Sequence, residues 1–433
     1  MARMPAKPKK TKAQLKVEDQ AMKRALALLR KVPLMEMESL NMTTREEINR
    51  ASDVLEEIGV SVCNVHDSEE ERLAFQKEVV TQVWNSMLDE QALSPEKAAQ
   101  VRYIIDDISL KWYTGDLPKW LEKELNRAFN KMTYLHCGFG APSSNKSFNL
   151  ECSWKLRCNK KLAKFAQHYL NTKDVKYSFD RCIAKMPGAG EEDFLHKDQD
   201  INTPKRTKSQ IHGKYCATES TFLFVPRSHH DHEEMYKTYK PMYDGVTGDK
   251  WGLDPTKDDP LNFFARARKI VVKAGSIVWW DTSTIHGVLK NTSDHIGFGI
   301  YLGFETDIER PGYLKKAGVE EYQDRFDAYS KGRAPVLHPS LDRVALYPKR
   351  FKNFHGILGK YIERMDPNTK QYDLSKRKLL RKGVEKWVPH MVQHDPVNYK
   401  PPVLSRRGQQ MLVGRARVDQ FFPKPDSEVI EID

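Results

Sequence analysis

The sequence predicts an α+β protein whose core is a jelly roll of short β-strands, with helices before and after that core. Between residues 134 and 310, short runs rich in Val, Ile, Phe, Tyr and Trp alternate with Gly, Pro and polar loops, which is typical of antiparallel strands. The preceding segment, 41–133, instead repeats apolar residues at three- and four-residue spacing, which indicates amphipathic helices. The change of period near residue 134 separates the two regions.

The expected helices come first along the chain. The run 69–90 repeats Val, Trp, Met and Leu at helical spacing, and a second helix begins at Ser94, a favourable N-cap that is followed by Pro95 at the first helical position. A third amphipathic helix is expected over 117–132. The strand-like runs then cover 176–186, 220–226, 267–273, 276–281 and 295–304, with a turn at Ala274–Gly275.

The chain therefore divides into five expected segments. They are a basic N-terminal arm (1–40), a helical region (41–133), a jelly-roll core (134–310), a basic and partly helical extension (311–395) and a flexible tail (396–433). The arm includes "KPKKTK", which is either a nuclear import signal or a solubilising sequence. The cationic run 374–387 is expected to be helical, with a solvated face as its simplest interpretation.

Composition sets the broad class. Of 433 residues, 39% are hydrophobic and 10% aromatic, which is enough for a large core, and the net charge of +12 permits contact with nucleic acid through the basic segments. The six cysteines form no CxxC pair, and no apolar run approaches the roughly 20 residues that span a bilayer. We expect a nuclear or cytoplasmic protein that is neither secreted nor a membrane protein; its oligomeric state is not indicated.

Three residues stand out as candidate metal ligands. His196 and Asp198 are spaced as "HKD", so in a strand both would point to one face, and His286 follows the strand-like run "SIVWWD". Two imidazoles and one carboxylate form the ligand set of non-haem Fe(II) oxygenases, which leaves metal positions open. A surface His-x-Asp together with an unrelated core histidine is the alternative.

The sequence around these residues resembles the phytanoyl-CoA dioxygenase family of Fe(II)- and 2-oxoglutarate-dependent oxygenases. The family pattern runs Lys-x-Pro-Gly-x-Gly, His-x-Asp, Pro-Gly-Ser-His and finally a strand turn that ends in His-Gly. The four elements occur in that order, within 179–304. Their matching residues are Lys185, Pro187, Gly188 and Gly190; His196 and Asp198; Pro226, Ser228 and His229, with Arg227 in place of Gly; and Gly275, His286 and Gly287.

The resemblance implies a double-stranded β-helix (cupin-like) core and a mechanism. Iron would be held by His196, Asp198 and His286, and 2-oxoglutarate would chelate it as co-substrate. Oxidation of 2-oxoglutarate to succinate would then drive hydroxylation of a substrate. Related halogenases lack the carboxylate ligand, so Asp198 favours hydroxylation. By family position, Lys185 would contact 2-oxoglutarate; an exposed lysine at a strand end is the alternative.

The sequence departs from the family at the co-substrate anchor. Family members usually place an Arg eleven residues beyond the distal histidine, to bind the C5 carboxylate of 2-oxoglutarate, whereas Gly297 occupies that position here. Lys214, on the strand expected after the His-x-Asp, is a substitute candidate, as in other oxygenase families. Otherwise co-substrate binding is altered or lost, and the protein is a non-catalytic member.

The tail carries a second resemblance. "RARVDQFF" is similar to the sliding-clamp-binding pattern of replication proteins, with matches at Val418, Phe421 and Phe422, although Arg415 replaces the usual Gln. Alternatively, the two phenylalanines dock on the protein's own surface. With the basic segments, a clamp motif would suit a nuclear enzyme acting on nucleic acid or chromatin. The competing hypotheses are a small-molecule hydroxylase with structural extensions and a non-catalytic DNA- or clamp-binding protein.

Overall fold

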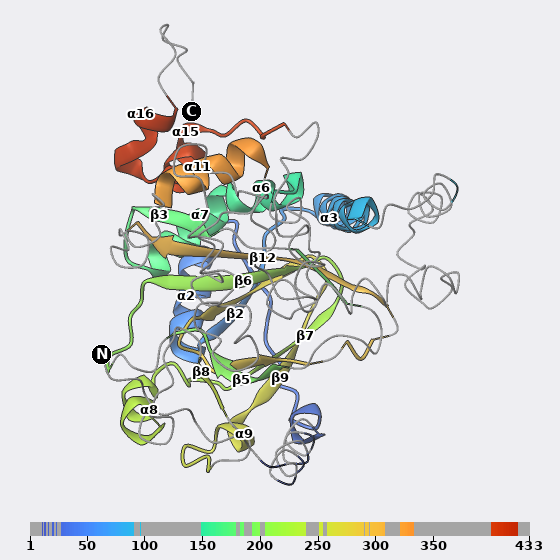
Figure 1. Ribbon diagram of the computed structural model, residues 1–433, viewed down its shortest axis with the longest axis vertical. Helices are drawn as coiled ribbons and strands as arrows, with labels where there is room; N and C mark the ends of the chain where they lie inside the picture. The colour runs from blue at the N-terminus through green and yellow to red at the C-terminus, as the bar shows by residue number, and fades with distance from the viewer. Residues whose placement is uncertain are drawn as a thin grey trace, which may run out of the picture.

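The protein is represented by a computed structural model, which describes residues 27–90, 149–178, 182–185, 193–199, 204–239, 251–253, 258–289, 291–293, 295–307, 321–332 and 400–422, together with isolated positions before residue 27 and residue 96. Two β-sheets face each other in the centre, and helices pack on the outer face of the larger sheet (Figure 1). Within the described ranges, no helix is long and apolar enough to cross a membrane.

The larger sheet has seven strands in the order β1-β2-β10-β6-β12-β3, with β4 also paired to β12. All of its pairings are antiparallel except that of β1 with β2. This sheet provides the long, regular half of the jelly roll. Its strands are β1 (Leu40–Asn41), β2 (Val60–Asn64), β3 (Val175–Ser178), β4 (Cys182–Lys185), β6 (Gln210–Cys216), β10 (Ser276–Asp281) and β12 (Gly297–Thr306).

The smaller sheet has five strands in the order β8-β5-β11-β7-β9, all antiparallel. From β5 to β7 and again from β9 to β12, successive strands along the chain alternate between the two sheets, so most neighbours in this sheet are far apart in sequence. That alternation is the double-stranded β-helix arrangement, so the predicted fold class is confirmed. The strands are β5 (Asp193–Lys197), β7 (Ser220–Phe224), β8 (Trp251–Gly252), β9 (Arg268–Val272) and β11 (His286–Val288).

Each sheet separates two apolar layers because side chains alternate along a strand. In β10, Ile277 and Trp279 point to the helix side, whereas Val278 and Trp280 join the layer between the sheets. The layer between the sheets also receives Phe222 and Phe224 from β7. Polar side chains on these inner faces are therefore enclosed between the two sheets.

Helices cover the outer face of the larger sheet (Figure 1). The first, α2, begins at the N-cap Thr44, which forms a reciprocal capping box with Glu47, and ends at Gly59, whose φ of 88° requires the left-handed conformation. From α7, Phe165 stacks on Trp279 with ring centroids 5.2 Å apart. The bounds of these helices are α2 (Arg45–Ile58), α3 (Glu69–Glu90), α6 (Glu151–Arg157) and α7 (Lys160–Tyr169).

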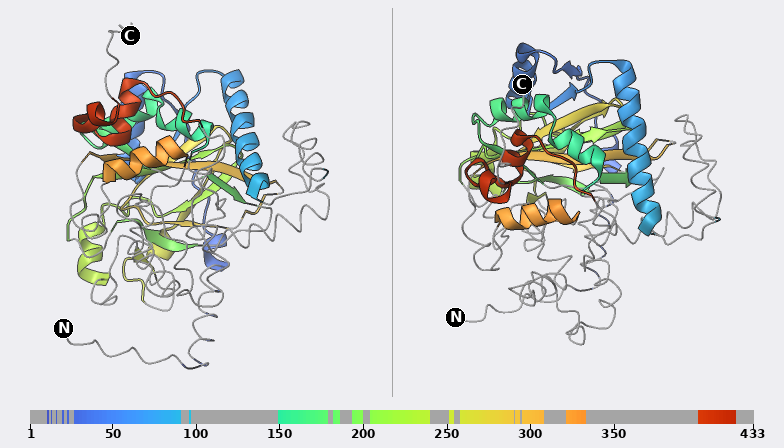
Figure 2. Two further views of the ribbon diagram at one scale, coloured as in Figure 1. Left: turned by 45° about the horizontal axis from the view of Figure 1, so that its top comes forward. Right: turned by 90° about the horizontal axis from the view of Figure 1, so that it is seen from above.

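The remaining elements lie on the outer faces of the two sheets (Figure 1). Two short helices, α8 (His232–Tyr239) and α9 (Phe263–Arg266), accompany the smaller sheet. On the side of the larger sheet, α11 (Glu321–Lys331) packs beside the C-terminal elements, as both views in Figure 2 show. The C-terminal elements are α15 (Arg406–Val413), the 3₁₀ turn η5 (Arg415–Arg417) and α16 (Val418–Phe421).

The structure adds four features to the predicted segments. Strands β1 and β2 belong to the main sheet although they lie at residues 40–64, and α6 and α7 are helices within the predicted jelly-roll segment. The end of the expected basic arm is docked, since Leu29 and Val32 are buried. The expected tail is not simply flexible, since residues 400–422 include helices with a buried face. The helices expected at 94–113, 117–132 and 374–387 lie outside the described residues.

Candidate metal centre

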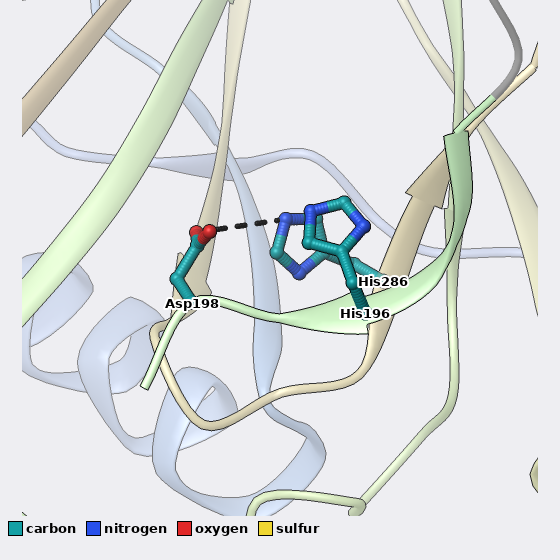
Figure 3. A group of neighbouring side chains, drawn as sticks. All are labelled: His196, Asp198 and His286. Atoms are coloured by element: carbon teal, nitrogen blue, oxygen red, sulfur yellow. Dashed lines mark ion pairs between the residues drawn. The ribbon is translucent and has the colours of Figure 1, made fainter. Parts of the chain in front are cut away.

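His196, Asp198 and His286 come together on the inner face of the smaller sheet (Figure 3). One ligand atom from each residue lies within 4.8 Å of the others, and all three residues are buried. His286, the first residue of β11, is the direct cross-strand partner of His196 in β5. Asp198 follows the last residue of β5. The sequence-predicted triad is thus a spatial cluster formed by two neighbouring strands.

The strand period explains why His196 and Asp198 share one side. Lys197, between them, points the opposite way, and its Nζ lies 2.6 Å from Nδ1 of the buried His232. The backbone N–H groups of Asp198 and Gln199 both donate to the carbonyl oxygen of Thr282, at 2.9 and 2.8 Å. These bonds hold the end of β5 beside the turn that leads into β11.

The Asp198 carboxylate is fixed by the opposite sheet. Its Oδ2 accepts a hydrogen bond from His212 Nδ1 in β6, at 2.8 Å, and another from Trp280 Nε1 in β10, at 3.3 Å. His212 and Trp280 are themselves cross-strand partners. Donors of this kind orient a metal-ligating carboxylate and stabilise its charged form. Neither His212 nor Trp280 was predicted from the sequence as part of the site.

The His286 ring is oriented by its own chain. Its Nδ1 donates to the carbonyl oxygen of Thr284 at 3.0 Å, because a carbonyl can only accept. This fixes the tautomer and presents Nε2, 3.6 Å from Asp198 Oδ2, as the nitrogen that faces the other two ligands. Phe222 stacks on the His286 ring with centroids 5.9 Å apart. Two imidazoles and one oriented carboxylate in an apolar surrounding fit a non-haem iron ion.

The Pro-x-Ser-His element supports the site without ligating. Ser228 Oγ donates to the Val225 carbonyl oxygen and accepts from the backbone N–H of Ile285, both at 2.8 Å, so it fixes the residue before His286. His229 Nε2 donates to a backbone carbonyl of α2, and burial lowers the pKa of His229 to about 4. Arg227 has a φ of 62°, the left-handed conformation that glycine adopts more easily, which explains the Gly of the family pattern.

A buried acid organises the turn before β11. Asp281 Oδ1 accepts from the backbone N–H of Ser283 at 2.6 Å, and its Oδ2 accepts from Tyr169 Oη at 2.5 Å and from Arg206 Nη2 at 2.9 Å. Arg206 also binds Glu56 of α2. Burial alone would raise the pKa of Asp281, but the charge and hydrogen bonds of Arg206 outweigh it and lower that pKa. This network ties the metal-side turn to α2 and α7.

The two lysines predicted to contact 2-oxoglutarate both lie on inward-facing strand positions. Lys214 in β6 is the cross-strand partner of Val278 and Tyr301, which belong to the layer between the sheets. Lys185 in β4 is the partner of Gly297, the position at which the family carries its Arg, and its Nζ donates to the Leu289 carbonyl oxygen at 3.4 Å. Pro187, Gly188 and Gly190 lie outside the described residues.

The clamp-like residues of the tail contact the protein itself. Val418 is buried, and the half-buried Phe421 and Phe422 pack on Phe326 of α11, with ring centroids 5.2 and 5.3 Å away. In the structure the two phenylalanines therefore dock on the protein's own surface, as the alternative hypothesis expects. Sliding-clamp binding stays a prediction, and it would require these side chains to leave α11.

The facing sheets and the buried His-Asp-His cluster between them define the class of the protein: a jelly-roll oxygenase that uses iron and 2-oxoglutarate. The family model Phytanoyl-CoA dioxygenase (PhyH) matches residues 21–297, well over half of the chain. The chain belongs to the phytanoyl-CoA dioxygenase family. No curated protein matches the chain.

Several solved structures are similar at low identity. AviO1 from Streptomyces viridochromogenes Tue57 is 13% identical over 62% of this chain and 100% of its own, with a TM-score of 0.37. EctD from S. alaskensis, solved with 2-oxoglutarate and 5-hydroxyectoine, is 14% identical over 64% and 80%, with a TM-score of 0.37. The non-haem α-ketoglutarate-dependent epimerase SnoN from nogalamycin biosynthesis is 11% identical over 61% and 84%, with a TM-score of 0.34.

Proposed function

We propose that His196, Asp198 and His286 hold one Fe(II) ion and that the protein hydroxylates an organic substrate with 2-oxoglutarate and dioxygen. The observation that carries this proposal is the enclosed cluster itself, with three ligand atoms within 4.8 Å and every ligand buried. When bound, iron and 2-oxoglutarate supply the oxidising chemistry. Asp198 occupies the carboxylate position, which favours hydroxylation over halogenation.

The surrounding side chains prepare the cluster for this chemistry. His212 and Trp280 hold Asp198 as an oriented anion, and the Thr284 carbonyl keeps His286 in the tautomer that presents Nε2. The Phe222 and Trp280 rings pack against His286 and exclude water from that side of the metal site. A dry, pre-oriented site limits side reactions of a strong oxidant.

The substrate is proposed to be a nucleic acid or a protein bound to it. The support comes from the sequence, which has a net charge of +12 and a lysine-rich arm that could contact phosphates. A small-molecule hydroxylase with structural extensions is the competing proposal. A non-catalytic role would retain iron binding without turnover.

Succinate release tests the proposal. Wild-type protein and His196→Ala are incubated with Fe(II), 2-oxoglutarate and oxygen, in the presence of nucleic-acid, chromatin-protein or metabolite pools. The expected result is succinate release that a nucleic-acid-containing pool stimulates at low salt and that His196→Ala abolishes. Stimulation by metabolites alone would contradict the proposed substrate, and iron binding without turnover in any pool would contradict the proposed reaction.

A further inference from the structure

Lys214 places a positive charge between the two sheets, close to the metal side of the fold. It lies two residues after His212 in β6, so both side chains project from the same face, about 7 Å apart along the strand. His212 is the residue that hydrogen-bonds Asp198. Lys214 is therefore one side-chain position away from the shell that surrounds the metal ligands.

The ammonium group of Lys214 is held by a neutral partner from the facing sheet. Its Nζ donates to Ser220 Oγ, at the start of β7, at 2.7 Å. Within the part of the chain that the structure describes, no carboxylate pairs with Lys214. Its cross-strand partners are Val278 and Tyr301, and Cys216 next to it on the same face is fully buried. A half-buried cation in such surroundings is stabilised when an anion binds it.

The inner face of β12 carries few side chains near Lys214, although a Cβ at Gly299 would meet the Tyr215 carbonyl oxygen at 2.6 Å. Gly297 and Gly299 carry no side chain there, and Tyr301 is the side chain beside Lys214. A Cβ added to Gly297 would meet its nearest atoms at 3.7–3.9 Å, an ordinary contact distance. Sterics at position 297 therefore do not explain why the Arg usual in the family is missing. The charge that it would provide has to come from another residue on the inner faces.

We propose that Lys214, assisted by Ser220, binds the C5 carboxylate of 2-oxoglutarate in place of the missing Arg. This inference rests on the proposed function, because the metal end of the co-substrate must be held by the His-Asp-His cluster. Lys185, the other inward-facing candidate, is the partner of Gly297, at the far end of β12 from the metal cluster. By register, Gly303 pairs with His212 and Tyr301 with Lys214, so Lys185 lies farther along the strand from the ligands.

Ligand binding to matched variants tests this assignment without turnover. Fe(II)-loaded protein is titrated anaerobically, by calorimetry, with 2-oxoglutarate and with 2-oxopentanoate, which has the same chelating end and chain length but no C5 carboxylate. Wild type is expected to bind 2-oxoglutarate more tightly. Lys214→Met should weaken 2-oxoglutarate binding about 10- to 100-fold and Ser220→Ala about 5-fold, because a charged and a neutral hydrogen bond are lost. Both variants should bind 2-oxopentanoate as wild type does.

Lys185→Met tests the competing lysine with the same substitution, and if Lys214 is the C5 anchor this variant should keep the preference for 2-oxoglutarate. The unchanged affinity for 2-oxopentanoate shows that each variant is folded and holds iron. Retention of the full preference in Lys214→Met, or its loss in Lys185→Met, would overturn the assignment. If wild type binds iron but neither 2-oxo acid, both this inference and the proposed function fall; if it binds both equally, only the C5 anchor falls.

Discussion

His196 and His286 are direct partners in the antiparallel pairing of β5 and β11, with ring centroids 4.3 Å apart. Strand register alone thus brings together two ligands that are distant in sequence. A slip of one residue in either strand would turn its ligand to the opposite face of the sheet. The hydrogen bonds that fix both strand ends, from the Ile285 N–H to Ser228 Oγ and from the Asp198 N–H to the Thr282 carbonyl oxygen, therefore also hold the metal ligands in place.

Removing the His212 hydrogen bond should weaken metal binding. His212→Phe keeps a ring of similar size but leaves Asp198 without its 2.8 Å donor, so we expect metal affinity to fall about 10- to 100-fold. His212→Gln, whose amide can still donate, should recover part of the loss. The measurement is the dissociation constant for Fe(II) under anaerobic conditions. Equal affinities in wild type and His212→Phe would show that this bond does not position the carboxylate.

Breaking the buried ion pair of Asp281 should destabilise the fold. Asp281→Asn removes the charge that faces Arg206 at 2.9 Å in a fully buried position, and we expect a loss of about 3 kcal/mol in the free energy of unfolding. Glu56→Gln, which breaks the more exposed pair of the same arginine, should cost less than about 1 kcal/mol. Urea unfolding measures both variants, and equal losses would contradict this ranking.

Stability should fall in two steps as the solution is acidified. Burial lowers the pKa of His229 from 6.5 to about 4, because the folded protein favours the neutral ring. The contribution of His229 to the free energy of unfolding is therefore complete above pH 6.5 and declines between pH 6.5 and pH 4. Burial would raise the pKa of Glu56, but hydrogen bonds from Arg206 and Lys208 outweigh it and lower that pKa from 4.5 to about 2. The contribution of Glu56 to the free energy of unfolding therefore declines between pH 4.5 and pH 2. His229→Gln should flatten only the first step, and Glu56→Gln only the second.

The experiment for this prediction is the free energy of urea unfolding measured against pH for wild type and both variants. In the wild type, the slope from His229 should not exceed about 1.4 kcal/mol per pH unit, the value for one proton. Stability that is constant from pH 7 to pH 4 would contradict the burial of a neutral His229.

Truncating the aromatic end of the tail should loosen the C-terminal elements. Phe421→Ala with Phe422→Ala removes two half-buried rings that contact Phe326, and we expect a loss of about 2–3 kcal/mol in the free energy of unfolding. A pull-down with a sliding clamp on the same pair of proteins tests the partner prediction. Unchanged stability together with clamp recovery only by the wild type would mean that the side chains serve a partner and not α11.

The sequence was sufficient to predict the fold class and the residues that meet at the candidate site. The triad could be identified because i, i+2 spacing and the order of four short elements are local signals. Strand β2 was missed because its five residues begin just after the end of α2, and their extended conformation is stabilised by pairing with β1 and β10. The strand conformation of β2 therefore depends on tertiary contacts that the local sequence does not reveal.

The supporting shell of the site could not be predicted for a similar reason. His212 becomes a partner of Asp198 only because β6 faces the end of β5 across the interior, a relation set by the packing of two sheets. Asp281 is the last residue of a strand-like run and resembles an ordinary turn residue in the sequence. Its importance comes from Tyr169 and Arg206, which lie far away in the chain.

Metal binding by the wild type and by ligand variants tests the central claim most directly. Purified protein is titrated with Fe(II) under anaerobic conditions, alongside His196→Ala, Asp198→Ala and His286→Ala, with circular dichroism to confirm folding. The account predicts one high-affinity iron per wild-type chain and loss of that site in each folded variant. Retention of wild-type affinity by any of the three folded variants would contradict the assignment of His196, Asp198 and His286 as the metal centre.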